Sequence, residues 1–80
     1  MFETVSAYPN PTTGIFEIDL PFIIKEVRIE LFTINSQLIN SNNYYVTNGK
    51  VELNIESMPS AVYLVKVYLD KPVSFKIIKI

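Results

Sequence analysis

Residues 8–14 read Tyr8-Pro9-Asn10-Pro11-Thr12-Thr13-Gly14 and lie directly before the first clearly alternating segment of the chain. The two prolines fix φ and remove two backbone donors, so neither a helix nor a strand ladder continues through this stretch. The residues before them, Tyr8 and Asn10, are restricted to extended backbone. Gly14 then supplies a position where positive φ carries no steric cost. The stretch therefore predicts a rigid corner that determines where the next strand begins.

Alternation of apolar and polar residues dominates the chain beyond this corner, and no sustained 3.6-residue period is present. Residues 15–20 alternate and predict a strand that Pro21 ends. Residues 27–31 alternate in the same way and predict a second half-buried strand. After it we expect a turn at 33–37, a short partner strand at 37–39 and a polar loop at 40–43.

The second half of the chain contains the strongest hairpin signal, Asn48-Gly49, because both central residues of a type I′ turn need positive φ. We expect residues 44–47 and 51–55 to flank that turn. A corner at 57–60 precedes residues 62–69, which are apolar on nearly both faces, as in a central strand. A last turn at 70–72 leads into a final strand at 73–80.

These segments amount to six or seven short strands at roughly ten-residue spacing, a pattern typical of an all-β sandwich. The spacing alone does not choose between a sandwich and a small barrel. Shared parity on alternating strands predicts the core. Its expected members are Phe16, Ile18, Leu20, Val27, Ile29, Leu31, Leu53, Ile55, Tyr63, Val65 and Val67.

Length and composition narrow the classes of protein that remain. Eighty residues make one domain, expected to span 1–80, with residues 1–7 forming a first strand and the end of an upstream linker. A net charge of -1 excludes a nucleic-acid binder of the ordinary basic kind. No segment reaches the roughly 18 apolar residues of a membrane helix. The start of the chain lacks the features of a signal peptide, so we expect the natural protein to extend upstream.

Catalytic chemistry is largely missing, because the chain has no histidine and no cysteine. Glu17 with Asp19, and Glu52 with Glu56, share a strand face by parity. Each pair suggests either a paired-carboxylate or calcium site, or a solvated strand face, and the solvated face is favoured. We therefore expect no catalytic residue, no metal, no cofactor and no enzymatic activity.

Two further groups of residues allow two interpretations. The four tyrosines at 44, 45, 63 and 68 form either a stacking platform for sugars or bases, or packing pairs between strands, which we favour. The lysines at 66, 71, 76 and 79 either protect an edge strand or present a positive handle, and the first interpretation is favoured. The uncharged segment Tyr44-Tyr45-Val46 predicts weak self-association through a strand edge.

The segment from Tyr8 to Phe16 resembles the opening motif of the type A C-terminal sorting domain of the type IX (Por) secretion system. Residues 27–39 resemble the second block of that family, residues 53–67 its third block, and Lys76-Ile77-Ile78-Lys79-Ile80 its lysine-flanked last strand. Two departures concern turns. Ser36 and Ala61 stand where the family usually has glycine, so those turns are built without positive φ or with some strain.

The resemblance implies a small Ig-like antiparallel β-sandwich of about seven strands that acts as a transport address for a larger cargo protein. Such a domain is recognised by the outer-membrane secretion machinery of a Gram-negative bacterium and is then removed by a signal peptidase. The cargo passes through the periplasm to the outer-membrane surface or the extracellular space. The residues expected to carry recognition are Tyr8, Pro9, Asn10, Pro11, Gly14, Pro59, Tyr63, Lys76 and Lys79. The alternative is an Ig-like accessory module that binds carbohydrate or protein, or acts as a spacer, next to a catalytic domain.

Overall fold

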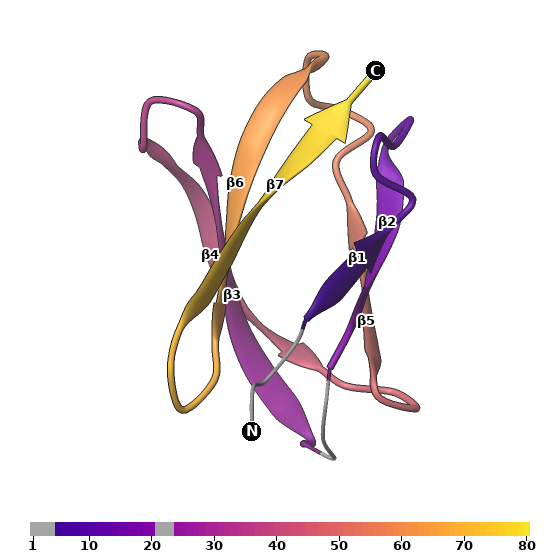
Figure 1. Ribbon diagram of the computed structural model, residues 1–80, viewed down its shortest axis with the longest axis vertical. Helices are drawn as coiled ribbons and strands as arrows, with labels where there is room; N and C mark the ends of the chain where they lie inside the picture. Colours follow the sequence, from indigo (N-terminus) through magenta and orange to yellow (C-terminus); the bar gives the residue numbers. More distant parts are fainter. Residues whose placement is uncertain (1–4, 21–23) are drawn as a thin grey trace.

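The computed structural model describes residues 5–20 and 24–80, and over these residues the chain forms seven strands and two antiparallel sheets (Figure 1). One sheet has the order β1-β2-β5 and the other has the order β4-β3-β6-β7. This confirms the predicted all-β sandwich and decides against a closed barrel. The strands are β1 (Ser6–Tyr8), β2 (Ile15–Asp19), β3 (Glu26–Thr33), β4 (Leu38–Tyr45), β5 (Lys50–Asn54), β6 (Ala61–Tyr68) and β7 (Val73–Lys79).

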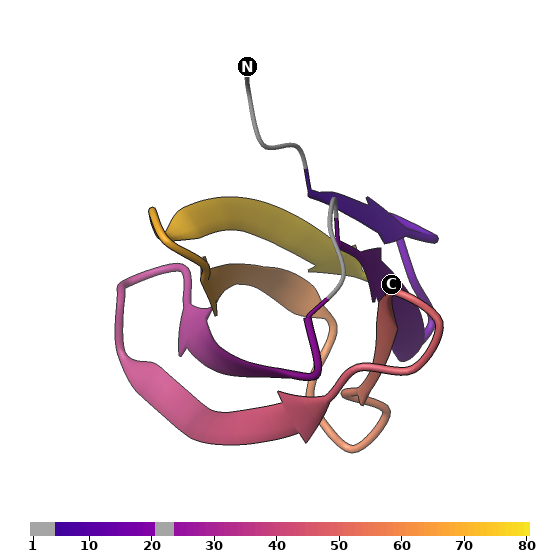
Figure 2. The ribbon, with the colours of Figure 1, turned by 90° about the horizontal axis from the view of Figure 1, so that it is seen from below.

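The chain crosses between the sheets, because β2 pairs with β5 and β3 pairs with β6. Their registers set Phe16 opposite Leu53 and Ile29 opposite Val67, so inward-facing apolar residues meet within each sheet. Figure 2 shows the four-stranded sheet curving around the three-stranded sheet. The β7 edge consequently comes next to the link between β1 and β2.

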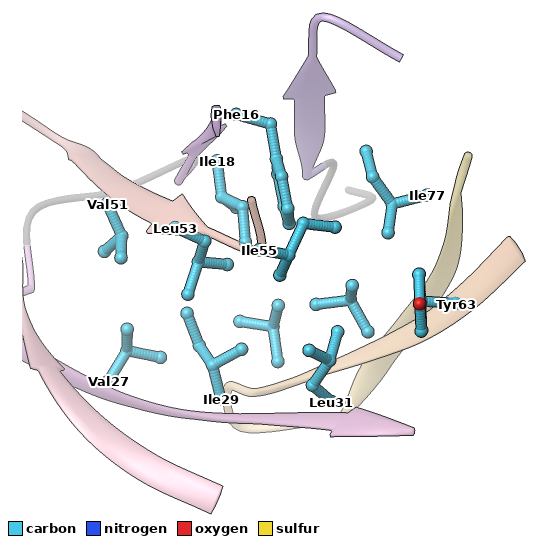
Figure 3. Packing of buried hydrophobic residues seen from close by; sticks show 12 residues of the cluster. Phe16, Ile18, Val27, Ile29, Leu31, Val51, Leu53, Ile55, Tyr63 and Ile77 are labelled. Atoms are coloured by element: carbon cyan, nitrogen blue, oxygen red, sulfur yellow. The ribbon is translucent and has the colours of Figure 1, made fainter. Parts of the chain in front are cut away.

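The two sheets enclose a core whose side chains point toward one another from both layers (Figure 3). Ten of the eleven residues predicted for the core are buried. Leu20 is the exception and is half-buried at the margin of the core, because it follows the end of β2. Val51 and Ile77, which share the inward parity of β5 and β7, are also buried.

The polar loop predicted at 40–43 is wrong. Residues Asn40 to Asn43 lie in the middle of β4 and pair with β3 from Leu31 to Arg28. Asparagine has a low strand propensity, but β4 lies at the edge of its sheet, where polar side chains reach water. Backbone pairing with β3 therefore outweighs the local signal.

The predicted turn at Asn48-Gly49 is confirmed, but the prediction that the strands on either side of it pair as a hairpin is wrong. Asn48 and Gly49 have φ of 55° and 74°, and Thr47 and Lys50 exchange two backbone hydrogen bonds of 3.0 Å. Beyond that bridge the flanking strands separate, because β4 belongs to one sheet and β5 to the other. The turn moves the chain between the layers of the sandwich.

The two expected departures from glycine behave differently. Ser36 has φ of 67°, so the β3–β4 turn uses the left-handed region despite a side chain. The Ser36 N–H donates to the Thr33 carbonyl at 2.9 Å and compensates part of that strain. Ala61 begins β6 in extended backbone. The predicted strand end at Pro21 and the start of the expected first strand at residues 1–4 lie outside the described residues.

Candidate functional site

The Tyr8–Gly14 motif contacts the last strand, β7, on the edge that does not pair with β6. It connects β1 to β2 and meets the end of β7 at the same end of the sandwich (Figure 1). Thr12 forms a parallel bridge with Lys79. The Thr12 N–H donates to the Ile78 carbonyl at 2.8 Å, and the Ile80 N–H donates to the Thr12 carbonyl at 2.9 Å. The motif therefore joins the two sheets through the last strand.

Asn10 extends this contact with its side chain. Its Nδ2 donates to the Lys76 carbonyl at 2.9 Å, and its Oδ1 accepts from the Ile78 N–H at 2.9 Å. An amide side chain offers both a donor and an acceptor, so it satisfies the edge of β7 as the peptide group of a neighbouring strand would. Pro9 and Pro11 on either side follow cis peptide bonds and have no N–H of their own.

Thr12 and Gly14 form the buried part of the motif. Thr12 is 1% exposed, and its Oγ1 donates to the Ile15 carbonyl at 2.8 Å and accepts from the Gly14 N–H at 3.0 Å. Gly14 has φ of +152°, and a Cβ there would collide with Cγ of Glu56. Glycine is needed because the segment after β5 runs against this position. The sequence interpretation did not single out Thr12, although a threonine two residues before a turn glycine is a known signal for such a bond.

Tyr8 anchors the start of the motif on the outer face of the three-stranded sheet. Its hydroxyl donates to Asp19 Oδ1 at 3.1 Å and accepts from Lys50 Nζ at 3.0 Å. Lys50 also lies 3.7 Å from a Glu17 oxygen and 3.9 Å from an Asp19 oxygen. The bond to Tyr8 and the nearby carboxylates raise the pKa of Lys50. The Glu17–Asp19 pair therefore flanks a lysine, which is how a solvated strand face is stabilised.

Pro59 and Tyr63 secure the corner before β6. The Tyr63 hydroxyl donates to the Pro59 carbonyl, and the Tyr63 ring, 4% exposed, lies in the core (Figure 3). Tyr63 pairs with Ile77 on β7, which connects this corner to the last strand. Because its ring is buried, Tyr63 stabilises the corner and β7 by packing and cannot itself contact a partner protein.

The two lysines of β7 lie beside the motif. Lys76 is exposed on the outer face, opposite Leu64, while Lys79 has the inward parity and is half-buried opposite Ala61. Lys66 lies on the same outer face of the neighbouring strand β6, opposite Ser74, with its Nζ 5.0 Å from the centre of the Tyr68 ring. Lys71 lies in the β6–β7 turn at the far end of β7. Lys71 and the half-buried Lys79 therefore lie apart from the outer face that carries Lys66 and Lys76.

The four tyrosines at 44, 45, 63 and 68 do not share a surface. Tyr63 is in the core, Tyr44 packs against the core margin, and Tyr45 is 82% exposed at the end of β4. Tyr68 is half-buried, and its hydroxyl donates to Glu30 Oε1 at 2.7 Å. This separation favours packing roles over a stacking platform.

Within residues 5–20 and 24–80 no group of three or more histidine, cysteine, aspartate or glutamate side chains is arranged to hold a metal ion. The same residues contain no helix long and apolar enough to cross a membrane.

Of the residues predicted for recognition, the structure therefore brings Asn10 onto the end of β7, where Lys76 and Lys79 lie. Tyr8 and Gly14 contact the three-stranded sheet and the segment after β5 instead. Pro59 and Tyr63 form the corner before β6. Comparison with known protein families matches residues 6–80 to the secretion system C-terminal sorting domain. The match spans every strand of the sandwich. The comparison with curated proteins gives no match. The chain belongs to the C-terminal sorting domain family of the type IX secretion system.

Proposed function

We propose that this domain directs a larger cargo protein across the outer membrane of a Gram-negative bacterium and is then removed from it by a signal peptidase. The cargo is covalently attached upstream of the domain. It passes through the periplasm and reaches the outer-membrane surface or the extracellular space. Membership of the sorting-domain family supports the transport role, and removal of the domain is the finer part of the proposal.

The observation that carries the proposal is the contact between Asn10 and the last strand. Two side-chain bonds and two backbone bonds hold residues 76–80 against the motif. An ordered strand end lets a partner recognise a defined shape without ordering a flexible tail, which would cost affinity. The folded sandwich, rather than a linear peptide, is then the signal that the secretion machinery recognises.

The surface offered to that machinery combines polar backbone with positive charge. The exposed residues Tyr8, Pro9, Asn10 and Pro11 lie on one side of the β7 edge, and Lys76 and Lys79 lie on the strand itself. Lysines at the rim of an interface mainly accelerate association and select partners of complementary charge. We propose that they guide the domain to an acidic surface of the machinery while the motif supplies shape.

Removal of the domain requires a scissile bond outside the ladder of the sandwich. Pairing with β2 starts at Ser6, which lies opposite Asp19. A protease acts on extended segments more readily than on residues held in a sheet. We therefore place the cut upstream of Ser6, where it would release the cargo and leave the sandwich intact.

A reporter export assay tests the proposal. A periplasmic reporter carrying an N-terminal signal peptide is joined to residues 1–80 and expressed in a bacterium that has the type IX system. The expected result is reporter in the medium or on the cell surface, shortened by the mass of the domain, and reporter retained in the periplasm when the domain is omitted. Retention with the intact, folded domain would contradict sorting. Export at full length would contradict removal alone.

A further inference from the structure

The four-stranded sheet ends at β4, whose outer edge has no neighbouring strand among the described residues. This strand is eight residues long, reads Leu-Ile-Asn-Ser-Asn-Asn-Tyr-Tyr, and contains neither a charged residue nor a proline. Natural proteins usually block such an edge with charge, proline or a covering segment, because an open edge pairs with other chains.

The other three edges of the described sheets are protected. The end of β7 is covered by Asn10 and Thr12, and β7 also carries Lys76 and Lys79. β1 is three residues long, and β5 is five residues long with Lys50 and Glu52 on it. β4 alone combines length with the absence of charge, and it also exposes Leu38 at 56%, Ile39 at 39% and Tyr45 at 82%.

The backbone groups of β4 that point away from β3 can be identified from the pairing. Val46 N–H donates to the Lys25 carbonyl, so Val46 directs its backbone groups toward β3. Successive residues of a strand alternate in this direction. Tyr44 and Asn42 therefore also pair with β3, whereas Tyr45, Asn43 and Ser41 direct their N–H and C=O groups toward the open side.

We infer that this edge is a docking site for the β4 strand of a second copy of the chain, paired antiparallel about Asn43. In this register Asn43 lies opposite the same residue of the second copy, and Ser41 lies opposite Tyr45. Each outward residue exchanges both backbone hydrogen bonds with its opposite number. The sequence suits this self-pairing, because a large ring always lies opposite a small polar side chain and no like charges face each other.

A cavity beside β4 gives a second reason for an occupant there. It has a volume of about 300 Å³, a floor that includes Phe16 and Leu53, and a rim formed by Asn40 and Tyr44 of β4 and by Glu52 of β5. In the proposed register, Tyr44 of a second copy lies on the inner face opposite Asn42. It would cover the mouth of this cavity and shield core side chains from water, which a bare backbone pairing would not do.

The docking site lies at the opposite edge of the sheet from the recognition site, since the strand order is β4-β3-β6-β7. Self-pairing therefore leaves the motif and the end of β7 accessible. The contact is one strand wide and lies well below the roughly 1,200 Å² of a stable interface, so the association is weak and depends on concentration.

Sedimentation of the 80-residue chain over a concentration series up to the millimolar range tests the inference. The wild-type chain is expected to shift from monomer toward dimer. Asn43→Lys and Asn43→Glu each place like charges face to face at the two-fold axis, so each variant alone should remain monomeric. An equimolar mixture of the two should recover the dimer. Asn35→Lys makes the same change in the exposed β3–β4 turn and should dimerise as the wild type does.

Three results would overturn the inference. They are a wild-type chain that is strictly monomeric, charged variants that associate as the wild type does, and a mixture that stays monomeric. If the wild type is monomeric and Asn43→Lys, with an unchanged melting temperature, impairs export, the edge pairs with a strand of the secretion machinery. Melting curves of each variant confirm that the domain is folded, and Asn43→Glu remains informative if the lysine next to Arg28 disturbs the sheet.

Discussion

The side-chain carbonyl of Asn10 accepts a hydrogen bond of 2.9 Å from the backbone N–H of Ile78, a residue 68 positions further along the chain. The amide nitrogen of the same side chain donates to the Lys76 carbonyl. One side chain of the opening motif therefore forms hydrogen bonds with two backbone groups of the last strand. This contact makes the motif and the lysines of β7 parts of one surface.

Asn10→Ala should loosen the end of β7. Two hydrogen bonds are lost, but water reaches this edge and replaces them in part, so the free energy of unfolding should fall by only about 1 kcal/mol. The local effect should be larger, with the Ile78 amide exchanging its hydrogen faster. Hydrogen exchange and chemical unfolding measure both. Asn35→Ala, in the exposed β3–β4 turn, is the control, and equal Ile78 exchange in both variants would contradict the proposed contact.

The two glycines should respond differently to alanine. Gly49→Ala places a Cβ in open space at φ of +74°, and should cost about 1–2 kcal/mol of unfolding free energy for the left-handed backbone. Gly14→Ala adds a collision, because the new Cβ would lie 2.9 Å from the Cα of Glu56, and should cost about 2–4 kcal/mol. Urea unfolding of both variants checks this order. A smaller loss at Gly14 than at Gly49 would show that the motif does not press against the segment after β5.

Stability should depend on Glu30 in acid. Hydrogen bonds from Tyr68 and Ser41, and then the bond and charge of Arg28, hold the pKa of Glu30 below its usual value of 4.5. A lowered folded-state pKa means that the contribution of Glu30 is complete above the unfolded-state pKa. It is then lost as the pH falls from about 4.5 through the folded-state pKa.

Tyr68→Phe should reduce this contribution, because the variant removes the donor closest to the carboxylate. The expected result is lower stability at pH 7 and a smaller further loss between pH 5 and pH 3, measured by urea unfolding at each pH. Tyr45→Phe, at a residue that is 82% exposed, should behave as the wild type does. Parallel stability curves for Tyr68→Phe and the wild type across this range would rule out the role of Tyr68.

Core truncations should separate inward from outward positions. Ile29→Ala and Val65→Ala remove buried groups that are 1% and 0% exposed, and each should cost about 1–4 kcal/mol of unfolding free energy. Ile34→Ala removes a side chain that is 51% exposed and should change it by less than about 0.5 kcal/mol. Equilibrium unfolding measures all three, and a neutral result at both buried positions would mean that the inner face is misassigned.

Much of the fold could be predicted from the sequence because parity is a local property. Phe16 and Ile18 alternate with acidic residues, and Ile29 alternates with Arg28 and Glu30, so their inward faces follow from strand geometry. The residues proposed for recognition were predicted from the resemblance of their motif. The contact that explains its arrangement, Asn10 with β7, joins the two ends of the chain and has no local signal.

The errors arise where pairing with a distant strand outweighs local preference. Asn40 to Asn43 look like a loop, yet β3 supplies backbone partners along their whole length. The turn at Asn48-Gly49 has the chemistry of a hairpin, yet its two sides join different sheets. No feature near residue 48 indicates which sheet receives β5, since that depends on β2, more than thirty residues earlier.

The claim that the lysines of β7 belong to the recognised surface is tested most directly by Lys76→Gln combined with Lys79→Gln. Export of a fused reporter and the melting temperature of the domain are measured together. The matched control is Lys25→Gln combined with Lys71→Gln, which removes the same charge from exposed positions near the start of β3 and in the β6–β7 turn. We predict that both double variants melt as the wild type does and that export falls only for Lys76 and Lys79. Unchanged export with unchanged melting for the combined Lys76→Gln and Lys79→Gln variant would contradict the claim. It would show that these lysines only keep the strand solvated.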